Sequence, residues 1–344
     1  MLRWSLVDWY YYCYRCGKKY PRGVRFRCEC GEPLFVGYHY AEARDYRELF
    51  PCEGIKLGEG YTPLLQLDGV FIKNEGLNPT LSFKDRGTSI GVAMAMAFGF
   101  RSVGAVSTGN MAISVATYAA YLGLRCEVIV HSGAPSSKLK ALEALGAELK
   151  VVEPREYSAW YYRSLRSRTT YFINSDNPFR VEGQKTCAFE LFEQVGKPTE
   201  VILPVSSGGN ISALWKGFIE LKELGYLEEV PRFVAAQAEG CSPIVRAFRE
   251  KLNRVVPVEE PRTIASAIAN GDPPSGNRAL YILRKTDGLA VAVSDEEILE
   301  AAKALARRGI IAELASAAAY AAYLKVRNEL GERPVVIITG SGFK

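Results

Sequence analysis

The sequence places one lysine where its amine could do chemistry. Lys84 lies within Asn78-Pro79-Thr80-Leu81-Ser82-Phe83-Lys84-Asp85-Arg86-Gly87, between a proline-containing turn and an apolar run, Ile90 to Phe98, that predicts a helix. A lysine amine near a helix N-terminus can form a Schiff base with an aldehyde cofactor. A Lys-Asp-Arg triplet is also typical of a solvated helix start. This motif alone therefore leaves both interpretations open.

A second loop has groups suited to a carboxylate. Ser107-Thr108-Gly109-Asn110 stands between a β-like run, Ser102 to Val106, and an Ala-rich helical run, Met111 to Leu122. Hydroxyls and backbone N–H groups would then meet at a helix N-terminus, which favours an anion. An ordinary capped helix has the same pattern.

Two more loops have the composition of phosphate sites. Asn174-Ser175-Asp176-Asn177-Pro178-Phe179-Arg180 follows the predicted strand Thr170 to Ile173, and its arginine offers a planar fork of donors. Ser206-Ser207-Gly208-Gly209-Asn210 follows the predicted strand Val201 to Val205, and its adjacent glycines let successive N–H groups cradle a phosphate. By itself, the first is more often a turn with a surface arginine. For the second we favour the phosphate cradle over a plain tight turn.

Four cysteines crowd the N-terminal segment. Cys13 and Cys16 form one close pair, and Cys28 and Cys30 form another. Two such pairs can bring four thiolates to one tetrahedral zinc, with no open position for catalysis, so the ion would be structural. The second pair has one intervening residue where two are usual, so a disulfide or free thiols remain alternatives.

Strands and helices alternate along most of the chain, which predicts parallel sheets covered by helices, with ligands beyond the carboxyl ends of the strands. Leu64 to Leu67 and Val70 to Lys73 predict a hairpin, and Val181 to Val195 predicts one continuous helix. Ser294 with acids in the next turn predicts a capped helix.

Composition indicates a globular protein of ordinary kind. The 344 residues are 48% hydrophobic and 24% charged, and the net charge of +5 is spread along the chain, so no nucleic acid partner is expected. No apolar run approaches the ~18 residues that span a bilayer. The N-terminus lacks the pattern of a signal peptide, and we expect a cytoplasmic protein without a membrane partner. His39 and His131 have no neighbours typical of a catalytic or metal site.

Taken in order, these motifs resemble those of the fold type II pyridoxal-phosphate enzymes and, within them, the threonine synthase family. The resemblance covers nearly the whole chain and includes the cysteine segment, which is similar to the N-terminal zinc ribbon of one form of that family. The matching segments are Glu59 to Pro63, Asn78 to Gly87, Ser107 to Asn110, Asn174 to Arg180, Glu182 to Thr186, Thr263 to Ile268, Ala315 to Ala318 and Thr339 to Gly342.

The resemblance implies a role for each matching residue. Lys84 would bind pyridoxal phosphate as a Schiff base and move protons, Asn110 would contact the ring hydroxyl, and Thr339 would contact the pyridine nitrogen. The cofactor phosphate would be held by Ser206, Ser207, Gly208, Gly209 and Asn210. The substrate carboxylate would be held by Ser107, Thr108 and Asn110, and the substrate phosphate by Asn174, Ser175 and Arg180. Zinc would be held by Cys13, Cys16, Cys28 and Cys30.

The resemblance also implies an architecture and a reaction. The fold class would be α/β, with two open, mostly parallel twisted-sheet domains and a small zinc-ribbon-like segment at residues 1–40. Residues 41–90 and 186–344 would form a large cofactor domain, and 91–185 a small mobile domain. The chain would be a homodimer in threonine biosynthesis, a lyase that converts O-phosphohomoserine and water to threonine and phosphate by γ-elimination and β-replacement.

Three departures from the family pattern put the substrate in question. Leu81 replaces a glycine, Ser206-Ser207 replaces Gly-Asn, and Glu313-Leu314 stands where Glu-Pro is common. The alternatives on the same fold are a cysteate synthase acting on O-phosphoserine and sulfite, and a threonine or serine dehydratase. A dehydratase has no need of the phosphate contact of Arg180. A non-catalytic metabolite- or nucleic-acid-binding protein is the alternative from another class, and Lys84 argues against it.

Overall fold

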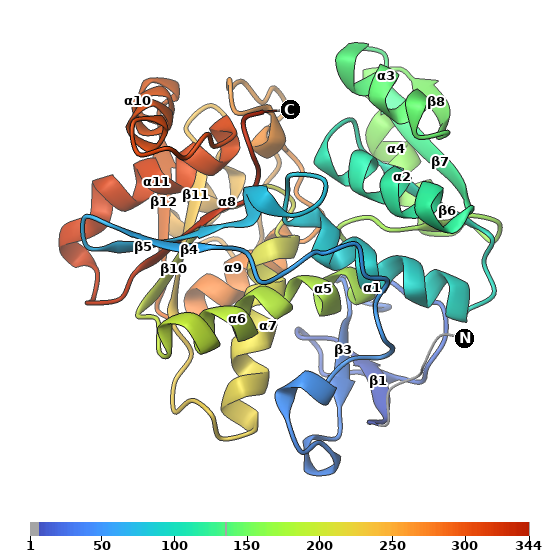
Figure 1. Ribbon diagram of the computed structural model, residues 1–344, viewed down its shortest axis with the longest axis horizontal. Helices are drawn as coiled ribbons and strands as arrows, with labels where there is room; N and C mark the ends of the chain where they lie inside the picture. The colour runs from blue at the N-terminus through green and yellow to red at the C-terminus, as the bar shows by residue number, and fades with distance from the viewer. Residues whose placement is uncertain (1–6, 135, 344) are drawn as a thin grey trace. The chain divides into compact units, whose positions relative to one another are not determined.

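The computed structural model describes residues 7–134 and 136–343, and the chain forms two compact units (Figure 1). Unit 1 comprises Met1–Glu59 and Lys84–Gln184, and unit 2 comprises Gly60–Phe83 and Lys185–Lys344. The large and small domains expected from the resemblance stay a prediction. Residues 1–6 of the expected zinc-ribbon-like segment, residue 135 of the small domain and residue 344 of the large domain lie outside the described residues.

Unit 1 begins with a small antiparallel sheet in the order β2-β1-β3. Aromatic residues favour strands, and those of β1 are alternately buried and half-buried, the period expected when one face packs inward. The strands are β1 (Trp9–Tyr12), β2 (Lys19–Tyr20) and β3 (Phe35–Tyr38), and the short helices η1 (Tyr40–Glu42) and η2 (Tyr46–Glu48) follow.

The rest of unit 1 is a four-stranded parallel sheet in the order β8-β7-β6-β9 with helices between its strands. The strands are β6 (Ser102–Val106), β7 (Arg125–His131), β8 (Glu148–Val152) and β9 (Tyr171–Phe172). The helices are α1 (Lys84–Ala97), α2 (Asn110–Leu122), α3 (Ser136–Ala144), α4 (Pro154–Ser164) and α5 (Pro178–Gln184). Gly123 ends α2 in a left-handed conformation, as expected of a glycine that stops a helix.

Unit 2 is built on a six-stranded sheet in the order β12-β11-β10-β13-β5-β4, parallel except for β4. Its strands are β4 (Leu64–Leu67), β5 (Val70–Asn74), β10 (Glu200–Pro204), β11 (Arg232–Ala238), β12 (Leu289–Val293) and β13 (Val335–Ile338). Its helices are α6 (Thr186–Val195), α7 (Gly209–Glu223), α8 (Pro243–Arg249), α9 (Gly276–Lys285), α10 (Asp295–Ala306) and α11 (Leu314–Val326). Short helices η3 (Glu75–Leu77), η4 (Ser266–Ile268) and η5 (Arg327–Glu329) complete it.

The α/β class and the parallel sheets predicted from the sequence are confirmed, and so is the hairpin, whose strands β4 and β5 pair antiparallel. The capped helix is confirmed too, because Ser294 and Glu297 form a reciprocal capping box at α10. The continuous helix from Val181 to Val195 is wrong. The structure has α5 and α6 with Lys185 between them, and the buried Lys185 side chain forms an ion pair with Glu220. Helix α9 was not predicted.

Within the described residues, no helix combines the length and apolar character needed to cross a membrane.

Candidate active site

Lys84 is the first residue of α1, and the residues after it are not a solvated helix start. Asp85 and Arg86 are buried, while Lys84 is half-buried. Asp85 accepts a hydrogen bond from the Ser114 hydroxyl of α2 at 2.6 Å, and the Thr88 hydroxyl donates to the Lys84 carbonyl at 3.0 Å. These contacts fix the backbone at Lys84 and leave the solvated interpretation without support.

The residues just before Lys84 run along the end of β13 in unit 2. Phe83 donates its N–H to the Thr339 carbonyl at 3.0 Å, and Ser341 donates to the Leu81 carbonyl at 3.0 Å. Leu81 has φ +60°, a left-handed conformation that suits glycine. The family pattern has glycine at this position, and glycine adopts a positive φ without strain. Leu81 adopts the same backbone conformation, but with strain from its side chain.

Thr339 follows β13 and is buried among polar groups. Its hydroxyl lies 2.9 Å from the Ser316 hydroxyl and donates to Glu313 at 3.3 Å. Ser316 in turn accepts from the Gly340 N–H at 3.0 Å. Glu313 and Ser316 belong to the start of α11, so this helix fixes the orientation of the Thr339 hydroxyl.

The loop from Ser206 to Asn210 has the features of a phosphate cradle. It joins β10 to the 15-residue helix α7, whose N-cap, Gly208, has φ +85° and provides no side-chain cap. Asn210 Nδ2 is buried and has no hydrogen-bond partner among the described residues. Uncapped N–H groups, a helix N-terminus and a spare buried amide donor all favour an anion at this loop. The residues present therefore fit the phosphate of the cofactor.

Three residues that the sequence analysis missed hold this loop in shape. Ser275 donates its N–H to the Ser207 carbonyl at 2.9 Å, and the Asn270 amide donates to the Ser207 hydroxyl at 3.0 Å. Arg278 of α9 is fully buried and donates to the Ser212 hydroxyl at 2.8 Å. The sequence does contain a signal for Arg278. It lies four residues before Ile282, so on a helix the two share one face, and an arginine on an apolar face indicates a buried polar contact.

In unit 1, the predicted substrate residues fall into two groups. Ser107 to Asn110 are half-buried at the start of α2, as expected for groups that meet a ligand. Asn174, by contrast, is buried, accepting from the Val106 N–H at 2.9 Å and donating to the Ser164 hydroxyl at 2.8 Å. Asn174 thus anchors the end of β6, just before Ser107.

Arg180 of α5 is a buried cation with neutral partners. Its guanidinium donates to the Ser175 hydroxyl at 3.3 Å, and the Gln184 amide oxygen, when turned towards it, accepts from Nε at 3.1 Å and from Nη2 at 3.2 Å. Among the ion pairs of residues 7–134 and 136–343, none includes Arg180. Burial lowers the pKa of Arg180 to about 10, so it remains charged at neutral pH. The turn with a surface arginine is excluded.

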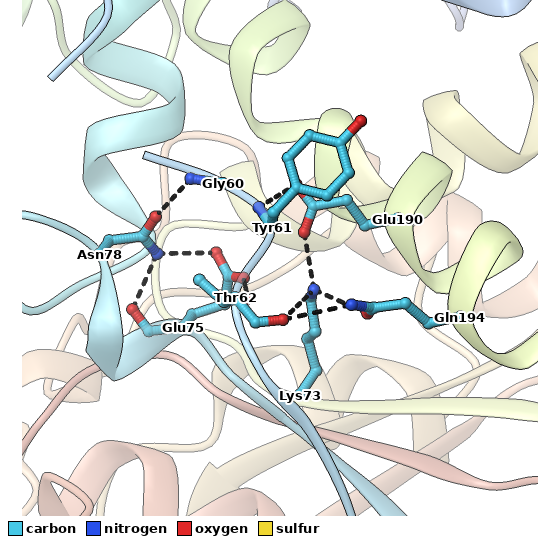
Figure 2. A network of polar contacts seen from close by, with 8 residues as sticks. All are labelled: Gly60, Tyr61, Thr62, Lys73, Glu75, Asn78, Glu190 and Gln194. Atoms are coloured by element: carbon cyan, nitrogen blue, oxygen red, sulfur yellow. Dashed lines mark hydrogen bonds and ion pairs between the residues drawn. The ribbon is translucent and has the colours of Figure 1, made fainter. Parts of the chain in front are cut away.

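The segment Gly60-Tyr61-Thr62 is held by side chains from three elements (Figure 2). Lys73 of β5 donates to Glu190 at 2.6 Å and to the Thr62 carbonyl at 2.8 Å, and Glu190 of α6 accepts from the Tyr61 N–H at 2.7 Å. Lys73 and Glu190 are both buried. Tyr61 itself has φ +47° and a side chain that is 76% exposed, so its unusual backbone is imposed by this network.

The same network reaches the lysine motif at its first residue (Figure 2). Asn78 accepts from the Gly60 N–H at 3.0 Å and donates to Glu75 Oε2 at 3.1 Å, while the Thr62 hydroxyl donates to Glu75 Oε1 at 2.6 Å. Within unit 2, these hydrogen bonds join the segment Gly60–Thr62 to the first residue of the lysine motif.

The four N-terminal cysteines converge as the sequence predicts. Their sulfur atoms all lie within 4.8 Å of one another, with Cys13 and Cys30 at 3.6 Å and Cys16 and Cys28 at 3.5 Å. Within the described residues, no disulfide joins any of the four. Thiolates around one tetrahedral zinc lie about 3.8 Å apart. Gly17 and Gly31, both at positive φ, close the two turns, and this donor set fits zinc.

We expect Gly208→Ala to weaken cofactor binding at least about tenfold, because a methyl group at φ +85° would meet the Ser275 carbonyl. Gly225→Ala is the matched control, with φ +80° and open space around its Cβ. Titration of the apoprotein with pyridoxal phosphate, followed by visible absorbance, measures both. Equal affinities for the two variants would contradict the role given to this loop.

We expect Lys73→Met to lower the free energy of unfolding by about 3–5 kcal/mol, because it leaves Glu190 buried without its cation. Lys303→Met is the control, since the pair of Lys303 with Glu300 is exposed and contributes less than about 1 kcal/mol. Urea unfolding of the two variants measures the difference. Similar losses of unfolding free energy in both would show that the buried pair contributes no more to stability than the exposed pair.

Comparison with known proteins agrees with this geometry. Residues 55–340 match the family model described as pyridoxal-phosphate dependent enzyme. The threonine synthase of Methanocaldococcus jannaschii is 39% identical, with 96% of this chain and 92% of the relative covered. That of Methanosarcina acetivorans is 37% identical, with 91% and 86% covered. A serine racemase structure from maize superposes with a TM-score of 0.69 at 22% identity over 82% of this chain and 88% of its own, which indicates a shared fold. The chain belongs to the pyridoxal-phosphate-dependent enzymes and, among them, to the threonine synthase family.

Proposed function

We propose that this threonine synthase family member converts O-phosphohomoserine and water to threonine and phosphate, as a carbon–oxygen lyase that acts by γ-elimination and β-replacement. The observation that carries the substrate assignment is Arg180. A buried guanidinium whose hydrogen-bond partners among the described residues are all neutral is suited to an anion from the ligand. A phosphorylated amino acid supplies that anion, whereas the substrate of a dehydratase does not.

We assign the binding roles residue by residue. The loop from Ser206 to Asn210 holds the cofactor phosphate, Asn110 contacts its ring hydroxyl, and Thr339 faces its ring nitrogen. Ser107, Thr108 and Asn110 hold the substrate carboxylate. Ser175 and Arg180 hold the substrate phosphate, with Asn174 at the base of the loop. When bound, pyridoxal phosphate supplies an electron sink for negative charge at the substrate carbon atoms.

Lys84 has two tasks in this proposal. Its Nζ would hold the cofactor aldehyde, and as a free amine it would be placed to take the proton from the substrate α-carbon. The fixed backbone at Lys84 limits the positions that the freed amine can adopt. The same amine would take the β-proton as phosphate leaves the γ-carbon and would return protons to the γ- and α-carbons, while Arg180 would stabilise the charge on the departing phosphate. That phosphate is then placed to act as general base for the water added at the β-carbon.

We expect wild-type protein to release phosphate from O-phosphohomoserine with threonine as the amino-acid product, and Lys84→Ala to release none above background. Lys84→Ala removes both the attachment point and the proton acceptor, so the loss should exceed about a thousandfold. Phosphate assay with amino-acid analysis measures this. If the wild type binds the cofactor but leaves O-phosphohomoserine unchanged, the substrate assignment is wrong, and O-phosphoserine with sulfite is the next pair.

We also propose that Cys13, Cys16, Cys28 and Cys30 bind one structural zinc ion. The mutual distances of their sulfur atoms and their closed four-ligand set support this. Elemental analysis of the purified protein should give about one zinc per chain. Cys28→Ser should lose the metal and lower the thermal midpoint, while Cys126→Ser, a buried cysteine in β7, should keep it. Metal-free wild type with an unchanged thermal midpoint would contradict the proposal.

The family resemblance further supports a homodimer, a cytoplasmic location, and a small mobile domain at residues 91–185. Sedimentation velocity of the holoenzyme tests the first of these, and a monomer at assay concentration would refute it.

A further inference from the structure

The N-terminal cysteine segment extends a charged side chain into the predicted substrate-phosphate loop. Arg27, next to Cys28, forms an ion pair between its Nε and Asp176 Oδ2, 149 residues away in sequence. Its Nη1 donates to the Gly31 carbonyl at 2.5 Å, and its guanidinium lies over the Tyr162 ring at 5.4 Å. Arg27 is therefore held by the turn of the second cysteine pair on one side and by unit 1's substrate motif on the other.

Other contacts join the same two parts of unit 1, where β1, β3 and α5 lie side by side (Figure 1). Tyr38 of β3 donates to Glu182 of α5 at 2.6 Å, and Trp9 of β1 packs edge-on against Phe179 with ring centroids 5.3 Å apart. Phe179 directly precedes Arg180. The sheet β2-β1-β3 therefore packs against α5, the helix that contains Arg180.

The role of Arg27 depends on the negative charge of Asp176. Its side chain is fully buried, between Ser175 and the helix of Arg180. Burial and, next, the Asp176 charge raise the pKa of Tyr161 well above its ordinary value, and the Asp176 charge also opposes the lowering of the Arg180 pKa by burial. Asp176 and Arg180 are therefore electrostatic neighbours, although no ion pair joins them within the described part of the chain.

A buried carboxylate requires a counter-charge, which Arg27 supplies to Asp176. The other candidate is Arg180, whose guanidinium donates to the hydroxyl of Ser175, the residue next to Asp176. In the structure, Asp176 forms its ion pair with Arg27, and the hydrogen-bond partners of Arg180 are neutral. Without the positive charge of Arg27, Asp176 would draw on Arg180, and the guanidinium would no longer be available to a phosphate.

We propose that Arg27 is a positioning residue for the substrate: by neutralising Asp176 it keeps Arg180 available for the substrate phosphate. This rests on the proposed function, in which Arg180 binds that phosphate. The cysteine segment then contributes to substrate affinity through one side chain, while the cofactor loop, in unit 2, does not depend on it.

The test compares charge variants of the holoenzyme by the KM for O-phosphohomoserine, kcat, and inhibition by inorganic phosphate. Arg27→Gln removes the charge but keeps a hydrogen-bond donor for Asp176, so the variant can still fold. We expect its KM and its inhibition constant for phosphate to rise about tenfold or more, with kcat within about threefold of wild type. The visible absorbance of the bound cofactor should be unchanged. Arg22→Gln, which alters an exposed pair with Asp8 in the same segment, should behave as wild type.

The Asp176→Asn background separates charge balance from packing. With Asp176 neutral, adding Arg27→Gln should change KM by less than about threefold, because no carboxylate is left to capture Arg180. A tenfold rise in the double variant, or no rise in Arg27→Gln alone, would overturn the inference while leaving the proposed function intact. Arg180→Gln distinguishes failure of this inference from failure of the proposed function. If Arg180→Gln leaves KM and phosphate inhibition unchanged, Arg180 does not bind the substrate phosphate, and the inference about Arg27 is wrong as well.

Discussion

Two ion pairs with buried members join distant parts of this sequence, and two loops of the candidate site depend on them. Lys73 and Glu190 are 117 residues apart, and Arg27 and Asp176 are 149 apart. An unpaired buried charge costs several kcal/mol, so each pair is stable only when both segments are in place. Folding of the sheet is thereby coupled to the geometry of the segment Gly60–Thr62 in unit 2 and of the loop before Arg180 in unit 1.

The sequence could predict what local patterns determine. The alternation of strands and helices, the hairpin β4–β5 and the capping box of α10 follow from periodicity and turn chemistry, and all three are confirmed. The four cysteines also converge as their spacing suggests. These features need no knowledge of which segments meet in space.

What the sequence could not predict depends on long-range contacts. The break between α5 and α6 occurs at Lys185, whose side chain pairs with Glu220 of α7, so tertiary pairing overrides a good helical pattern. Arg278 looks like a polar interruption of an apolar run until α9 places it beside Ser212. Likewise, nothing local indicates that the amide of Asn174 is used within the fold, by Val106 and Ser164.

The departures from the family pattern at Leu81 and at Glu313-Leu314 differ in their structural consequences. Leu81 occupies a left-handed conformation, so the position keeps its backbone geometry and gains strain. Glu313 still accepts from Thr339, and its backbone is extended where the helix α11 begins, so a proline after it is not needed to set that turn. Neither change alters a group that would meet the substrate.

The two anion sites proposed for this chain are built on different physical principles. The cofactor loop uses backbone N–H groups and a helix N-terminus, a geometry set by Gly208 and largely insensitive to side-chain charge. The substrate loop uses one charged group, the buried guanidinium of Arg180, whose availability depends on where Asp176 finds its counter-charge. A cradle of the first kind suits a group that stays bound, whereas a site of the second kind can be tuned by one or two substitutions. Changes of substrate on this scaffold should therefore arise around Arg180, Asp176 and Arg27, while the glycine loop remains as it is.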